Sequence, residues 1–176
     1  MKKVEHGKTF DRNAANPPAF EIFHNTVTEG YPKHWHTAIE IIMPTRGEYE
    51  VVVGKDSYNL KEGDIIMINS GVVHGMRFVS QGERIVMLVE PGCVENQEEM
   101  ETIFLRLPAI YFKKEDEEDP FYLFLRSQIL ELVREYDNEG AVMTHRICTG
   151  LKELFSEFGR KGFSDANAQN TFGAMK

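Results

Sequence analysis

The residue types best suited to chemistry lie in one short segment and at one later position. The segment 34–40 reads His-Trp-His-Thr-Ala-Ile-Glu, an HxHxxxE spacing, and a further histidine follows at 74. Residues of equal parity on one strand share a face, so His34, His36 and Glu40 are expected to point the same way. Two imidazoles and a carboxylate that converge suit a borderline divalent metal. The candidate ligands are His34, His36, Glu40 and His74.

These four side chains allow two interpretations. In the first, they hold a divalent ion (Zn, Fe, Mn or Ni) and leave open positions for water or substrate. In the second, they form a polar patch in a pocket that binds a small organic molecule without a metal. The residue types favour the first interpretation and are compatible with the second, so both stay open at this point.

Other reactive residue types form no comparable pattern. His6, His24 and His145 have no partners at metal-ligand spacing and are expected to be surface or locally hydrogen-bonded residues. Cys93 and Cys148 are too few and too scattered for a disulfide framework or a CxxC site, which predicts ordinary reduced thiols. No GxSxG motif or phosphate-binding loop is present.

The first half of the chain has the pattern of an all-β domain. Short β-rich runs alternate with turn sequences such as Gly54-Lys55-Asp56, which predicts an antiparallel sandwich or barrel. Trp35 has the parity opposite to the candidate ligands, so it is expected to pack rather than to touch a ligand. The expected strands are residues 20–23, 38–43, 48–53, 57–60, 65–68, 75–79 and 84–89.

After about residue 92 the hydrophobic period changes from two to about 3.6. Residues 96–107 form a moderate helix candidate, and Asp119-Pro120 is a strong helix start. One amphipathic helix is expected from Pro120 to about residue 136, and a second is expected to end near 159–162. Together they form an antiparallel helical hairpin. Their apolar stripes either cover the barrel or make a dimer contact.

The domain organisation follows from these elements. Residues 1–18 are expected to be an N-terminal arm, 19–92 the β-barrel, and 93–162 a helical region with the hairpin. Residues 163–176 are polar and aperiodic, which predicts a tail or linker. The charged run 113–119 is expected to be a solvated loop.

Two motifs carry a family resemblance. The HxHxxxE segment followed by Gly47 is similar to the first cupin motif, and Gly63 with Asn69-Ser70-Gly71 and His74 is similar to the second. The resemblance spans about residues 30–89. It implies a mainly β fold, an antiparallel, jelly-roll-like cupin barrel, here followed by a C-terminal helical hairpin. It also implies that the four candidate ligands lie in the mouth of the barrel.

A narrower resemblance comes from the segments 40–49 and 60–74. They resemble the N-terminal sensor domain of AraC-type transcription regulators, in which a cupin barrel holds an effector and a helical hairpin mediates dimerisation. The implied function is small-molecule sensing and homodimerisation, with the DNA-binding part not seen in these residues. The alternative is a stand-alone metal-dependent cupin enzyme, such as a dioxygenase or isomerase.

Composition excludes several other classes of protein. The formal net charge is −8 and no basic stripe is present, so direct contact of this chain with nucleic acid is not expected. Apolar residues make up 41% and charged residues 27%, the balance of a globular domain, and no apolar run is long enough for a membrane span. The N-terminus lacks an apolar core behind its basic residues, which predicts a cytoplasmic location.

Overall fold

The computed structural model describes residues 19–26, 30–93, 108–114, 118–138, 140 and 142–167, and for residues 158–167 it describes the backbone alone. The expected arm, residues 1–18, and the helix expected over 96–107 lie outside the described residues. Among those residues, no helix is both long enough and apolar enough to cross a membrane.

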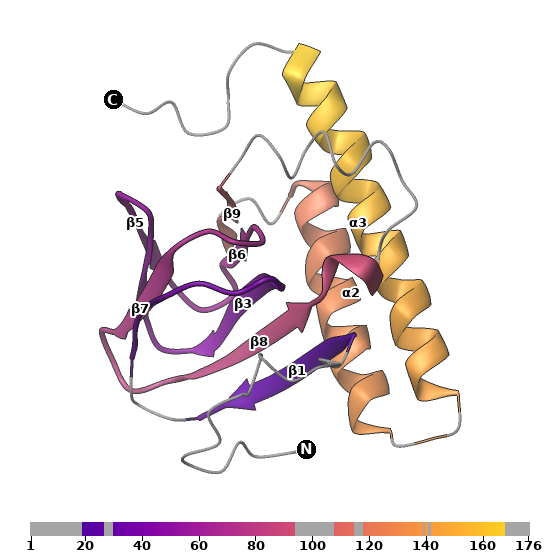
Figure 1. The fold of residues 1–176 in the computed structure, drawn as a ribbon, viewed down its shortest axis with the longest axis horizontal. Coiled ribbons are helices and arrows are strands. Elements are labelled where there is room, and N and C mark those ends of the chain that lie inside the picture. The colour runs from indigo at the N-terminus through magenta and orange to yellow at the C-terminus, as the bar shows by residue number, and fades with distance from the viewer. Residues whose placement is uncertain are drawn as a thin grey trace.

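Two antiparallel sheets form the barrel predicted from the sequence (Figure 1). The first sheet holds, in spatial order, β1 (Phe20–Asn25), β8 (Glu83–Val89), β3 (Ile39–Arg46), β6 (Ile65–Ile68) and β9 (Ala109–Phe112). The second sheet holds β2 (Tyr31–His34), β7 (His74–Phe78), β4 (Tyr49–Val53) and β5 (Asp56–Leu60).

Two of these strands were not predicted. β2 is exposed along its whole length, so it lacks the apolar alternation that identifies a half-buried strand. β9 is separated from the other strands by residues 94–107, in a part of the chain where the pattern indicated helices. Each of the two strands lies at an edge of its sheet and pairs with one neighbouring strand only. An edge strand can form with a weaker apolar pattern than a central strand, so its sequence is harder to identify.

The predicted helical hairpin is present as α2 (Pro120–Asp137) and α3 (Met143–Asn167), which lie side by side against the barrel (Figure 1). Asp119 caps α2, because its carboxylate accepts a hydrogen bond of 2.9 Å from the backbone N–H of Phe121. Pro120 occupies the first helical position, where its missing N–H costs nothing.

α3 is longer than expected. It continues through Gly159 and Gly162 to Asn167, so the backbone of residues 163–167, expected as part of a tail, is helical. A glycine in a helix interior costs only about 1 kcal/mol relative to alanine, and the packing of the preceding turns outweighs that cost. The helix end predicted at 159–162 was therefore wrong.

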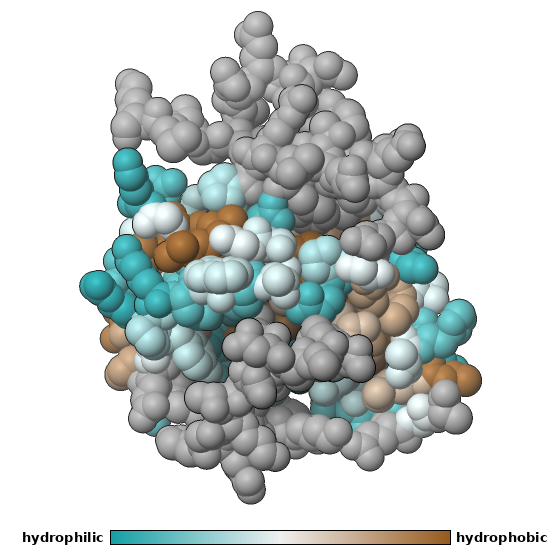
Figure 2. Space-filling view, in the orientation of Figure 1, coloured by the Kyte–Doolittle hydropathy of each residue, from teal (hydrophilic) through white to brown (hydrophobic). Residues whose placement is uncertain are grey.

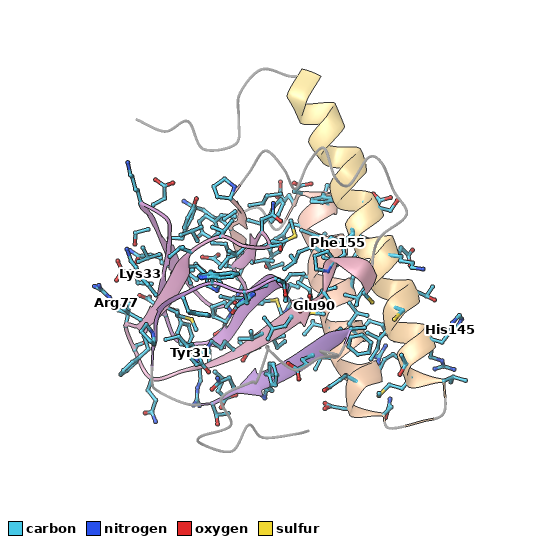
Figure 3. The ribbon with its side chains drawn as sticks, in the orientation of Figure 1. Tyr31, Lys33, Arg77, Glu90, His145 and Phe155 are labelled. Carbon is cyan, nitrogen blue, oxygen red and sulfur yellow. The ribbon has the colours of Figure 1, made fainter. Side chains whose placement is uncertain are left out.

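The apolar stripes of both helices cover the outer face of the first sheet. Figure 3 shows Phe155 on the barrel side of α3 and His145 on the opposite side. Phe155 is fully buried, whereas His145 is exposed. The helix residues in this shared core are Phe121, Tyr122, Leu125, Ile129, Leu132, Ile147, Leu151, Leu154 and Phe155.

One turn fixes the position of the strands behind the site. Gly63 adopts a φ of 86°, which a side chain would strain, and its N–H donates to the carbonyl of Pro44 at 2.8 Å. The carboxylate of Asp64 accepts hydrogen bonds from the backbone N–H groups of Lys61 and Lys114 and from the hydroxyl of Tyr111. Asp64 therefore ties the start of β6 to β9.

Candidate metal and ligand site

The four candidate ligands form one cluster. One potential ligand atom from each of His34, His36, Glu40 and His74 lies within 4.8 Å of every other. His34 ends β2, His36 lies in the connection to β3, Glu40 lies in β3, and His74 begins β7. His36, Glu40 and His74 are buried and His34 is exposed, so the cluster lies at the edge of the interior.

The cluster forms for a different reason from the one that parity suggested. His34 and Glu40 lie in different sheets, and the segment between β2 and β3 crosses from one sheet to the other. His74 pairs directly with His34 across β2 and β7. Trp35, expected to pack, is 66% exposed. The prediction that the four residues meet was right, but the prediction that three of them share one strand was wrong.

Glu40 is the centre of the cluster. Its Oε2 lies 2.9 Å from Nε2 of His36 and 2.8 Å from Nε2 of His74. The rings of His34 and His74 are 4.4 Å apart between centroids, and those of His36 and His74 are 4.8 Å apart. One carboxylate oxygen thus faces one imidazole nitrogen from the connection between β2 and β3 and another from β7 in the second sheet.

The backbone fixes the tautomer of each histidine. Nδ1 lies 2.9 Å from the carbonyl of Pro32 in His34, 2.9 Å from that of Ala38 in His36, and 2.8 Å from that of Val72 in His74. A carbonyl oxygen only accepts hydrogen bonds, so each Nδ1 must carry a proton and donate. In the neutral form of each ring, Nε2 is then a bare lone pair.

This arrangement requires a cation. With neutral rings, the Nε2 lone pairs of His36 and His74 would face a carboxylate oxygen at hydrogen-bond distance with no proton between them, which is repulsive. Either protons on these nitrogens or a divalent ion must supply positive charge. Backbone carbonyls that orient the second nitrogen of each ring are also what metal-binding histidines use.

The pKa values of Glu40 and His34 reflect their burial and the charges of the neighbouring residues. Burial alone would raise the pKa of Glu40, but hydrogen bonds from His36 and His74 outweigh it and lower the pKa to about 2. Burial lowers the pKa of His34, with a smaller contribution of the same sign from the neighbouring His74. The cluster therefore holds an ionised carboxylate and favours an unprotonated His34, the forms that bind metals.

The spacing of the ligand atoms fits a metal ion. Ligands bound at about 2.0–2.2 Å from one ion lie roughly 3–4 Å from one another. The closest separations here are 2.8 and 2.9 Å, and the widest is 4.8 Å. The four residues could therefore hold a divalent ion, with Glu40 supplying the negative charge.

Comparison with known proteins identifies the β part of the chain. Residues 25–90 match the model of the cupin domain family. The chain contains a cupin domain. A search of curated proteins gave no significant match.

Solved structures share the fold over different lengths of the chain. ToxT from Vibrio cholerae O395 is 12% identical, with a TM-score of 0.54 over 88% of this chain and 56% of that one. ToxT from Vibrio cholerae strain SCE256, solved with an unsaturated fatty acid bound, is 13% identical, with a TM-score of 0.52 over 86% of this chain and 57% of that one. Oxalate decarboxylase from Bacillus subtilis, solved as a mutant, is 18% identical, with a TM-score of 0.36 over 40% of this chain and 20% of that one. The chain thus spans little more than half the length of ToxT.

An apolar wall lies next to the cluster inside the cupin domain. Ala38, Val86 and Leu88 form a small buried group, with Phe23 packed against it. The exposed fraction is 7% for Val86 and 7% for Leu88. It is 0% for Met87, which lies between them and faces the outer side of β8. Apolar side chains with residual exposure therefore adjoin a polar cluster.

The depressed pKa of Glu40 predicts an acid-sensitive contribution to stability in metal-free protein. A carboxylate whose pKa falls from 4.5 unfolded to about 2 folded stabilises the fold fully above pH 4.5 and loses that contribution as pH falls toward 2. The loss amounts to about 3 kcal/mol. In the presence of a chelator, urea unfolding of wild type should show this loss, and that of Glu40→Gln should not.

The matched control is Glu90→Gln. Glu90 lies at the end of β8 (Figure 3) and accepts a hydrogen bond from the hydroxyl of Thr37, outside the cluster. As pH falls toward 2, Glu90→Gln should lose as much free energy of unfolding as wild type does. Equal acid dependence in wild type and Glu40→Gln would contradict the assignment.

Proposed function

We propose that this chain is the small-molecule-sensing and dimerisation part of an AraC-type transcription regulator. The observation that carries the proposal is the extent of the likeness to ToxT, an AraC-family regulator. The cupin model ends at residue 90, but the likeness to ToxT covers 88% of the chain and so includes the helical hairpin as well as the barrel. A barrel with a packed helix pair is the architecture that the AraC resemblance implies.

The cluster of His34, His36, Glu40 and His74 is the proposed binding site. Its need for a cation and its ligand spacing support a bound divalent metal, which would act as a Lewis acid toward an oxygen-bearing ligand. The residues of the chain would orient that ligand, with Glu40 holding the negative charge and the backbone carbonyls holding the three imidazoles in place.

The ligand class follows from the surroundings of the cluster. A polar site beside the apolar wall formed by Ala38, Val86, Leu88 and Phe23 suits a molecule with an oxygen-bearing head and an apolar body. ToxT, which shares the fold, has been solved with an unsaturated fatty acid. We therefore propose an amphipathic carboxylic acid as the effector.

Dimerisation is proposed through α2. Most apolar residues of the hairpin are used to cover the barrel, but Leu123 is 49% exposed and Leu130 is 39% exposed. Seven residues apart, they lie on one face of the helix. Figure 2 shows the apolar surface of the visible face as separate patches among polar residues.

A second candidate function is a metal-dependent cupin enzyme. The observation that favours it is the cluster of three histidines and one glutamate, which would leave positions open on an ion with octahedral coordination. Turnover of a bound carboxylic acid in the presence of the metal would support this function, and binding without turnover would support sensing.

Metal analysis tests the site directly. Chain produced without a His-tag and incubated with Zn, Fe, Mn or Ni should retain about one ion per chain by mass spectrometry. Glu40→Gln should retain markedly less, because it removes the charge that balances the ion, whereas Glu90→Gln should match wild type. Retention should also fall as pH drops through about 6, because protons compete for the imidazoles. Equal metal content in all three proteins would refute the site.

Calorimetric titration with palmitoleate, an unsaturated fatty acid, tests the ligand class. We expect binding by wild type and at least about 10-fold weaker binding by Leu88→Asp, which places a charge in the apolar wall. The methyl ester, which lacks the carboxylate, should also bind more weakly. His145→Asp is the control, because His145 lies at an exposed position of α3. Equal affinities for acid and ester would count against recognition of the head group at the cluster.

Light scattering tests the association. Wild type should give about twice the chain mass of 20.2 kDa at micromolar concentration. Leu130→Glu should weaken the dimer at least about 30-fold, the effect of losing roughly 2 kcal/mol at the centre of an interface. His145→Glu, a change at an exposed position of α3 (Figure 3), should leave the mass unchanged. A monomeric wild type would remove dimerisation from the proposal.

A further inference from the structure

The fold brings the two cysteines together. Cys93 ends the short helix η1 (Pro91–Cys93), which follows β8, and Cys148 lies in the second turn of α3. Figure 1 shows the turn at the end of β8 lying beside α3. The Sγ atoms of the two residues are 3.4 Å apart, although 55 positions separate them in the chain.

This proximity corrects the prediction that the cysteines are scattered. Sequence distance said nothing about the docking of α3 on the end of the barrel. At 3.4 Å the two sulfurs are in contact without a bond, and a disulfide needs about 2.05 Å. The sulfurs would have to approach each other by about 1.3 Å to form the bond. Both thiols are half-buried against the hydrophobic core, at its margin and not in its centre.

We propose that Cys93 and Cys148 are a modification site: a dithiol that oxidises reversibly to an intramolecular disulfide joining the end of the barrel to α3. The inference rests on the geometry of the pair and does not depend on the proposed sensing function. The disulfide would close a loop that contains β9 and α2, so it would fix α3 to the barrel at a second point besides the shared core.

A hydroperoxide is the class of oxidant that we assign. One of the two sulfurs attacks the terminal oxygen of ROOH, the O–O bond breaks, and the thiol proton goes to the leaving oxygen to give ROH, so that cysteine becomes a sulfenic acid. The other sulfur then attacks the sulfenic sulfur, the S–O bond breaks, and water leaves with the proton of the second thiol. In sum, two thiols and ROOH give one disulfide, ROH and water.

The contact between the two sulfurs makes the second step local. Burial, together with the hydrogen bond and charge of Cys148, raises the pKa of Cys93 to about 12, while Lys152 acts weakly in the opposite direction. Whichever sulfur is oxidised first, its partner lies 3.4 Å away and is placed to attack it.

The test uses the whole chain, first reduced and then treated with hydrogen peroxide after the reductant has been removed. We expect loss of both titratable thiols, a peptide pair cross-linked through Cys93 and Cys148, and no covalent dimer on a non-reducing gel. The oxidised form should melt on the order of 10 °C higher than the reduced form, because the bond closes a long loop. Incubation in glutathione buffers should change the oxidised fraction with the ratio of disulfide to thiol.

Single variants leave one sulfur without its partner. Cys93→Ser and Cys148→Ser should each stop at the sulfenic acid of the remaining cysteine, which dimedone traps. Neither should show the rise in melting temperature, and both should melt in the reduced state near reduced wild type. Two thiols that stay titratable after peroxide, a disulfide formed only between chains, or an oxidised form no more stable than the reduced one would each overturn the proposal. The last comparison needs no variant to fold.

Discussion

A buried carboxylate that faces two imidazole nitrogens is the constraint around which the site is built. Glu40 is 7% exposed, and its charge is tolerable there only because His36 and His74 direct Nε2 toward it. The histidines in turn direct Nδ1 to backbone carbonyls, so their rings cannot turn away without breaking a second hydrogen bond. The arrangement is stable only with positive charge at its centre, whether protons or a metal supply it.

The rest of the fold serves to bring these groups together from two sheets. β3 lies between β8 and β6 in the first sheet and carries Glu40, whereas β7 lies between β2 and β4 in the second sheet and carries His74. The crossing between β2 and β3 places His36 between the two sheets, where the N–H of Gly71 donates to its carbonyl at 2.8 Å. Gly71 has a φ of 73°, so the turn before His74 can make this contact without strain.

Much of this could be predicted from residue types and spacing. Alternation and turn residues located seven of the strands described here, and the Asp119-Pro120 cap located the start of α2. The identity of the four clustered residues also followed from the HxHxxxE spacing and from the later His74. What these patterns could not supply is the crossing between sheets, because strand parity describes one strand and His34 and Glu40 lie on two.

The features that were missed depend on tertiary contacts. β2 has no buried side chain to mark it, and its pairing depends on β7. The contact between Cys93 and Cys148 exists only because α3 docks against η1. Two of the hydrogen bonds that Asp64 accepts come from Tyr111 in β9 and from Lys114 just after it, so no local motif predicts them. Long-range pairing decided each of these features.

The two faces of β3 link the site to the helices. Glu40 points toward the cluster, and its neighbours Ile39 and Ile41 point outward into the core that the strand shares with α2 and α3. Their exposed surfaces are 2% and 1%, and both belong to the core that includes residues of the two helices. A close-packed core transmits displacement instead of absorbing it. A ligand or ion that moved Glu40 would therefore also act on the surface on which the helices rest, and the proposed sensing by the barrel requires such a contact.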